Sequence, residues 1–142
     1  MGNVRRIYVE KKEEYAVKAK ELKEEIVSYL QITSVDQVRV LIRYDVENLS
    51  DEVFEKACKG IFAEPPVDDL YLEKVDIPAG CQAFSVEFLP GQFDQRADSA
   101  MQCVQFLKED ENPIIKTAVT YILGGNFTED EFERIKSYAS TR

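Results

Sequence analysis

The sequence of 142 residues contains no histidine. This absence excludes Ser-His-Asp and Cys-His catalysis, histidine acid–base chemistry and most zinc sites. Cysteine is also scarce: Cys58, Cys81 and Cys103 lie far apart and form no CxxC motif. We therefore expect free thiols in a reducing compartment, and Cys58 and Cys103, which fall within predicted helices, to be buried and inert.

The chain has fewer positive than negative residues: 18 Lys and Arg against 27 Asp and Glu give a net charge of −9. Such a chain repels phosphate backbones and anionic headgroups, so we expect no nucleic-acid and no membrane partner. No apolar run approaches the roughly 20 residues that span a bilayer, and residues 1–10 lack the apolar stretch of a signal peptide. We expect a cytoplasmic protein with one compact domain.

The hydrophobic pattern of the first half predicts the order β-α-β-α. Residues 4–10 and 38–46 are typical of strands. Between them, apolar residues from Tyr15 to Leu30 recur at steps of three and four, which predicts a helix. Ser50 is the expected N-cap of a second helix.

The same order returns in the second half. Residues 83–88 and 114–123 have strand patterns, residues 93–107 have a helical pattern, and Thr128 with Glu131 forms a capping box before a last helix. Adding 78 to the apolar positions of the first long helix gives those of its counterpart, so that Tyr15 corresponds to Phe93; only the first strands need a one-residue shift. We interpret this as a duplication, with a chance likeness of two amphipathic segments as the alternative.

The predicted fold class is therefore α+β, with two duplicated β-α-β-α units. Residues 1–62 and 81–142 form the repeats, and residues 63–80 form a linker in which Leu70 and Leu72 could add a crossing strand. Each copy is too small for an ample core. We expect the two sheets or helix layers to pack on each other about an approximate twofold axis, with helices on one side of the sheet.

Few residues suggest chemistry. Asp68 and Asp69 could act as an acid and a base or hold Mg²⁺, but after two prolines a solvated turn or a cap is the favoured interpretation. The run Gly124-Gly125-Asn126 lacks the spacing of a phosphate-binding loop and suggests a turn. We predict no catalytic, cofactor-binding or metal-binding residue.

The segment LPGQFDQRADSA, residues 89–100, is the exception. Pro90-Gly91 predicts a tight entry to a helix, and Asp94 complements the helix dipole at that end. The segment and the helix after it contain no Lys and no Glu before residue 108. Because protein interfaces are depleted in Lys and Glu, we predict that this face docks on another protein domain. A helix that merely happens to be rich in Gln is the alternative.

Several segments carry a family resemblance: VRRIYVEKK (4–12), RYDVENLSDE (43–52), EPPVDDLY (64–71) and, most specifically, LPGQFDQRADSA. They resemble the N-terminal domain of the large, single-chain phosphoribosylformylglycinamidine (FGAM) synthase of de novo purine biosynthesis. The resemblance covers essentially the whole chain. That domain is similar to a dimer of the small subunit of the split enzyme, which bridges the glutaminase and synthetase parts and helps them transfer ammonia.

The resemblance implies a non-catalytic structural domain whose partners are the glutaminase and synthetase domains of the same enzyme. The family amidates formylglycinamide ribonucleotide with glutamine, ATP and Mg²⁺, but we expect no cofactor in this chain and no activity from it alone. The family's glutaminase uses a Cys-His-Glu triad, which a chain without histidine cannot supply. The expected contact residues are Arg43, Tyr44, Gln92, Asp94, Gln95 and Arg96.

Two questions stay open at this point. The docking face could let the isolated chain self-associate. The alternative function is a stand-alone small-molecule-sensing regulatory module, because duplicated α+β units often bind ligands between their halves.

Overall fold

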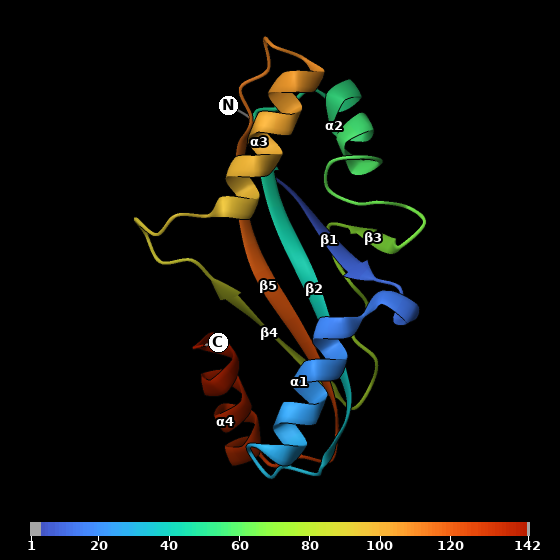
Figure 1. The fold of residues 1–142 in the computed structure, drawn as a ribbon, viewed down its shortest axis with the longest axis vertical. Coiled ribbons are helices and arrows are strands. Elements are labelled where there is room, and N and C mark those ends of the chain that lie inside the picture. Colours follow the sequence, from blue (N-terminus) through green and yellow to red (C-terminus); the bar gives the residue numbers. More distant parts are fainter. Residues whose placement is uncertain (1–3, 142) are drawn as a thin grey trace.

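The computed structural model describes residues 4–141, and these form an α+β fold with one five-stranded antiparallel sheet and four α-helices (Figure 1). The fold class predicted from the sequence is confirmed at this level. The elements in chain order are β1 (Arg5–Lys11), a short 3-10 helix η1 (Glu13–Tyr15), α1 (Val17–Ser28), β2 (Val35–Glu47), α2 (Asp51–Cys58), β3 (Asp68–Leu72), β4 (Cys81–Glu87), α3 (Gln95–Leu107), β5 (Ile114–Gly125) and α4 (Glu129–Ser140).

The strand order in the sheet is β3-β1-β2-β5-β4. The two long strands β2 and β5 pair along nearly their whole length, from Val35 opposite Gly125 to Glu47 opposite Ile114. The two halves of the chain therefore join edge to edge in one sheet. The expectation that two sheets or layers pack on each other is wrong, because the longest apolar strands satisfy their backbone hydrogen bonds by pairing with each other. Strand β3 lies within the linker and pairs with β1 at one edge.

The helices cover one face of the sheet. Alternate residues of β2, such as Ile42 and Tyr44, point to this face and pack in two apolar clusters. One cluster is completed by α2 and α3, and the other by α1 and α4. The opposite face carries ion pairs such as Arg39 with Glu10 and Arg6 with Asp45.

The helix caps follow the sequence. The side chain of Ser50 accepts a hydrogen bond from the Val53 N–H at the start of α2. Thr128 and Glu131 form the predicted capping box of α4, with hydrogen bonds of 2.9 and 3.1 Å. These caps can be predicted from the sequence, because each depends only on residues within one helical turn.

The ends of the predicted apolar stripes are exposed, which corrects the sequence analysis. Tyr15 lies in η1 before α1 begins, Tyr29 follows the end of α1, and Phe93 precedes the N-cap of α3. These three residues lie outside the α-helices, so the helical spacing that directs the inner apolar side chains towards the sheet does not apply to them. The buried residues of the two helices are instead the inner ones, Ala19, Leu22 and Ile26 in α1 and Ala97, Ala100 and Val104 in α3.

None of the helices in residues 4–141 combines the length and apolar character required to cross a membrane.

Candidate docking surface

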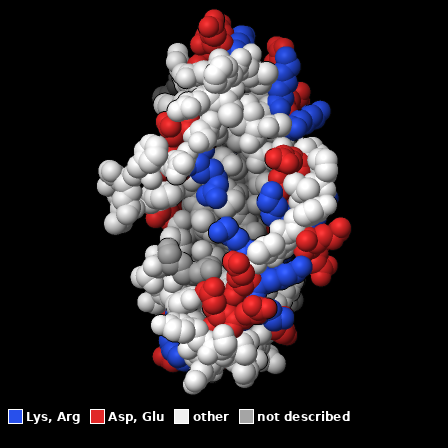
Figure 2. All heavy atoms as spheres, in the orientation of Figure 1, with Lys and Arg blue, Asp and Glu red and all other residues white. Residues whose placement is uncertain are grey.

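The loop between β4 and α3, residues 88–94, projects from the body of the protein (Figure 1). Its large apolar side chains point into solvent: Phe88, Leu89 and Phe93 are 47%, 68% and 70% exposed. Figure 2 shows this projection as an uncharged lobe of the surface. Neighbouring exposed apolar side chains of this kind mark interaction sites on soluble proteins.

Hydrogen bonds hold the tip of the loop in one shape. The side-chain carbonyl of Gln92 accepts from the Leu89 N–H at 2.6 Å, and the Gln92 N–H donates to the Leu89 carbonyl at 3.0 Å. Gly91 adopts a φ of 88°, which only glycine takes without strain. The loop is thus ordered before any partner binds, which lowers the entropic cost of docking.

Asp94 fixes the other end of the loop. Its carboxylate accepts from the Ala97 N–H at 3.0 Å, as the N-cap of α3, and from the backbone N–H and hydroxyl of Thr117 at 2.8 Å each. The pairing of β4 with β5 ends at Ala118. The N–H of Thr117 donates its hydrogen bond to the Asp94 carboxylate instead. Asp94 is a positioning residue that ties the loop and α3 to β5.

The surface of α3 continues from the loop. Gln95 and Arg96 are exposed at its first turn, and Phe106 near its end is 92% exposed. Ser99, Gln102 and Gln105 lie between them, all exposed. We define the docking surface as the loop 88–94 together with this exposed face of α3. This surface has no Lys and no Glu, which is the feature from which an interface was predicted. It also contains exposed apolar residues.

Arg43 and Tyr44, which are also expected contact residues, are buried and lie outside the surface defined above. Both are 7% exposed, because β2 is a central strand covered by neighbours on both edges. Arg43 makes ion pairs with Asp45 and Glu87 on the face without helices, and its Nε is buried without a hydrogen-bond partner.

Tyr44 points to the helix face and packs against Phe62, with 4.9 Å between ring centroids. Burial raises the pKa of the Tyr44 hydroxyl, while the positive charge of Arg96 lowers it in part. The expected contact residues line two different cavities. Arg43, Gln92 and Asp94 line one of about 610 Å³, and Tyr44 and Arg96 line another of about 340 Å³.

The carboxylate pair Asp68 and Asp69 does not form a metal site. The two side chains start strand β3 and are held by different lysines, Lys11 at 3.1 Å from Asp68 and Lys12 at 2.7 Å from Asp69. Asp68 is 8% exposed, so the interpretation as a solvated turn is wrong. Among residues 4–141 no cluster of three or more Cys, Asp and Glu side chains could hold a metal ion.

The cysteines differ from one another. Cys58 is half-buried, and its burial raises the pKa of its thiol, as expected of an inert residue. Cys103 is exposed on α3, so its predicted burial is wrong.

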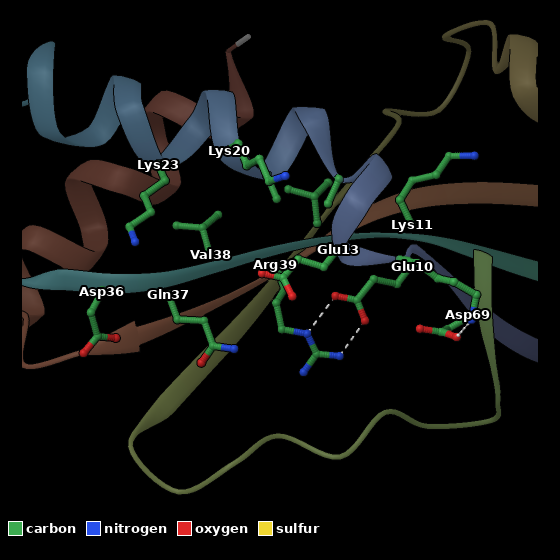
Figure 3. Close-up of a pocket in the computed structure, with 14 residues that line it drawn as sticks. Glu10, Lys11, Glu13, Lys20, Lys23, Asp36, Gln37, Val38, Arg39 and Asp69 are labelled. Carbon is green, nitrogen blue, oxygen red and sulfur yellow. Dashed lines mark hydrogen bonds and ion pairs between the residues drawn. The ribbon is translucent and has the colours of Figure 1, made fainter. Parts of the chain in front are cut away.

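A third cavity, of about 530 Å³, lies between α1 and strand β2 (Figure 3). Many of its charges are already paired. Arg39 donates two hydrogen bonds to Glu10, at 2.8 and 2.7 Å, and these raise the pKa of the guanidinium. Lys12 is paired with Asp69. Lys20 and Lys23 extend from α1 on one side of strand β2, and the Arg39–Glu10 pair lies on the other side (Figure 3). The paired groups stabilise the fold and leave no evident catalytic constellation here.

The exposure of the apolar residues in the loop was not predicted from the sequence, whose pattern placed Phe88 in a strand and Phe93 in the apolar stripe of a helix. One signal was available: Phe93 directly precedes Asp94, a favoured N-cap residue, and so lies outside the helix.

Comparisons with family models, with curated proteins and with solved structures each found no match.

Proposed function

We propose that this chain is a non-catalytic docking domain of FGAM synthase that contacts the glutaminase and synthetase domains and helps to organise ammonia transfer between them. The observation that carries the proposal is the projecting loop, whose exposed side chains Phe88, Leu89 and Phe93 are apolar. A cytoplasmic location is part of this proposal.

The family resemblance and the geometry point to the same segment. LPGQFDQRADSA is the most specific part of the resemblance, and it contains the exposed Leu89 and Phe93 and the first turn of α3. Exposed aromatic and leucine side chains on an ordered loop have no evident benefit for an isolated soluble domain. A partner that covers them would remove their apolar surface from water.

The strand register supports the duplication that this proposal includes. Ile7 pairs with Tyr44, and Phe84 pairs with Tyr121. The second pair therefore follows the first by 77 residues in both strands (84 − 7 and 121 − 44), so the one-residue shift expected only of the first strands applies to the second strands of this pairing as well. The buried residues of α1 and α3 are separated by 78 residues, as with Ala19 and Ala97 (97 − 19). Strands β2 and β5 lie at the centre of the four strands β1-β2-β5-β4, where a local twofold axis relating the two units would pass.

The experiment is a binding titration of this chain against an FGAM synthase from which the N-terminal domain has been removed. Glutamine-dependent turnover is followed in the same samples. We expect association and a recovery of turnover. The variant Leu89→Glu/Phe93→Glu should weaken association by more than tenfold, because it places two charges in the docking surface.

Leu72→Glu is the matched control. Leu72 is 60% exposed, but it lies on the edge strand β3, at the opposite side of the sheet from β4. The Leu72→Glu variant should bind the partner with the same affinity as the unmodified chain. A chain that folds but neither associates nor restores turnover contradicts the proposal, as does equal weakening by both variants.

A further inference from the structure

A hollow of about 340 Å³ opens on the helix face of the sheet, between the first turns of α1 and α3. Figure 1 shows the two helices starting near the middle of the molecule and running away from each other. Figure 2 shows Lys and Arg side chains gathered round a hollow at this place. The volume is at the lower end of the range of about 300–1,000 Å³ for ligand pockets, so an occupant has to be small.

The floor of the hollow is apolar. Val9 of β1, Val40 and Ile42 of β2 and the rings of Tyr44 and Phe62 line it. Tyr15 and Val17, 47% and 58% exposed, extend this apolar lining towards solvent. A ligand could therefore bury a flat apolar group here.

Two cations come to this hollow from equivalent places in the two helices. Lys18 is the second residue of α1, Arg96 is the second residue of α3, and both line the cavity. Neither forms an ion pair within 4.0 Å among residues 4–141. In a chain of net charge −9, two such cations in one cavity favour an anion.

The start of α1 adds to this positive potential. Helices α2, α3 and α4 each have a side-chain cap and acidic residues in the first turn, whereas α1 begins after Ala16 with neither. Within the described chain, no residue accepts a hydrogen bond from the N–H groups of Val17 and Lys18. Both residues line the hollow, and free N–H groups at a helix start bind anionic oxygens.

One oxygen of a buried carboxylate on the same cavity is ion-paired with Lys11 but accepts no hydrogen bond within the described residues. Asp68 is 8% exposed, and its Oδ2 accepts from the Glu64 N–H at 2.8 Å. Its Oδ1 lies 3.1 Å from Nζ of Lys11 in an ion pair, yet it accepts no hydrogen bond within the described residues. Buried polar oxygens normally accept at least one hydrogen bond, and a hydroxyl or ammonium group of a ligand would supply one to this atom.

We propose that this hollow binds a small organic acid with an apolar body and a hydroxyl or ammonium donor next to its carboxylate. The carboxylate lies between Lys18, Arg96 and the N–H groups at the start of α1. The apolar body covers the floor, and the donor reaches Oδ1 of Asp68. This site is separate from the docking surface in its contacts, apart from Arg96, and would make the domain responsive to a metabolite.

The test compares three probes that share one phenyl group. L-Phenylalanine has the carboxylate and the ammonium, 3-phenylpropanoate has only the carboxylate, and phenethylamine has only the ammonium. Titrations of the whole chain are followed by calorimetry and by backbone amide chemical shifts. We expect L-phenylalanine to bind with a Kd of about 1 mM or lower, 3-phenylpropanoate to bind more weakly, and phenethylamine not to bind. The shifts should be concentrated at Val17, Lys18 and Arg96.

Lys18→Gln and Arg96→Gln should each weaken binding of L-phenylalanine by about tenfold, a loss in the range for a charge-assisted hydrogen bond. Both side chains are exposed, so neither variant should unfold the protein. Lys20→Gln is the charge-matched control, because Lys20 is also exposed on α1 but lines the cavity beside β2.

Three results would overturn the inference. The first is no binding of L-phenylalanine at about 10 mM, far above a Kd of about 1 mM. The second is that phenethylamine binds as tightly as L-phenylalanine, and the third is that Lys18→Gln and Arg96→Gln bind L-phenylalanine as tightly as Lys20→Gln does. Failure here is distinguishable from failure of the docking proposal, because docking is also tested with a protein partner and with Leu89→Glu/Phe93→Glu, whose positions do not line the hollow.

Discussion

Asp94 and Thr117 join the start of α3 to the central sheet. The Asp94 carboxylate accepts hydrogen bonds from both the backbone N–H and the hydroxyl of Thr117, while it also caps α3. Thr117 is 5% exposed, so its N–H has little access to water. The same carboxylate therefore determines where the docking loop ends and where the helix begins.

Replacing Asp94 with alanine should lower the free energy of unfolding by about 2–4 kcal/mol. The loss of an N-cap costs about 0.5–2 kcal/mol, and an unpaired buried N–H costs about 1–3 kcal/mol. Urea denaturation measures this change. Asp98→Ala, which removes a first-turn carboxylate and the hydrogen bond it accepts from Gln102 on the same helix, should cost less than about 1 kcal/mol. Equal stability of the two variants would contradict the assigned role of Asp94.

Gly125 should tolerate no side chain. Its φ is 139°, and a Cβ there would lie 2.1 Å from the backbone oxygen of Ser34. Gly125→Ala should therefore destabilise the fold by at least about 3 kcal/mol, through backbone strain and a clash with a neighbouring strand end. Gly60→Ala is the control, because nothing lies within 4 Å of its added methyl group. It should stay within about 1 kcal/mol of the unmodified protein, and a similar loss in both variants would refute this account.

Local signals allowed much of the fold to be predicted. The caps at Ser50 and at Thr128 with Glu131 depend on contacts within one turn, and the helical and strand patterns place most elements within a few residues of their observed ends. The strand order was not predictable, because the pairing of β2 with β5 joins segments more than 60 residues apart in the chain. Nothing in either strand alone specifies its neighbour.

The same distinction applies to the candidate site. The exposure of Gln92, Gln95 and Arg96 followed from the composition of one segment. The burial of Arg43 and Tyr44 was not predictable from the sequence, because burial on β2 depends on the neighbours of that strand in the sheet. The hollow between α1 and α3 was likewise not visible in the sequence, since Lys18 and Arg96 meet only after the two halves have joined.

The stability conferred by the capping box of α4 should depend on pH. Hydrogen bonds from the Thr128 N–H and then from the Ser34 hydroxyl lower the pKa of Glu131 below its ordinary value of 4.5. A carboxyl group with a lowered pKa in the folded state stabilises the protein above its unfolded pKa. This contribution is lost as the pH falls through the folded pKa.

Glu131→Gln, which cannot titrate, should therefore be less stable than the unmodified protein near neutral pH. The difference between the two should decrease as the pH is lowered below 4.5. Thermal unfolding of both proteins across this range measures the difference. Glu133→Gln on the same helix, whose side chain only pairs with Lys136, controls for the loss of one negative charge. A difference for Glu131→Gln that is constant with pH would contradict the assignment.

Exposure predicts which of the expected contact residues affect docking. Gln95 and Arg96 are exposed on the first turn of α3, beside the apolar loop, whereas Tyr44 is buried against Phe62. Gln95→Glu/Arg96→Glu changes the charge of the docking surface by three units. If the proposed function is correct, it should weaken association with FGAM synthase lacking its N-terminal domain by at least about tenfold, which corresponds to about 1.4 kcal/mol.

Tyr44→Phe removes only the hydroxyl group of a residue that lines the hollow and keeps the ring packed on Phe62. The affinity for the partner should stay within about twofold, a change of less than about 0.5 kcal/mol. Calorimetric titration of the two variants against the same partner compares these effects. If Tyr44→Phe lowers the affinity as strongly as the charge reversal, Tyr44 is a contact residue after all, and the partner must displace a helix to reach the face of β2. If neither variant changes the affinity, the interface lies elsewhere on the domain.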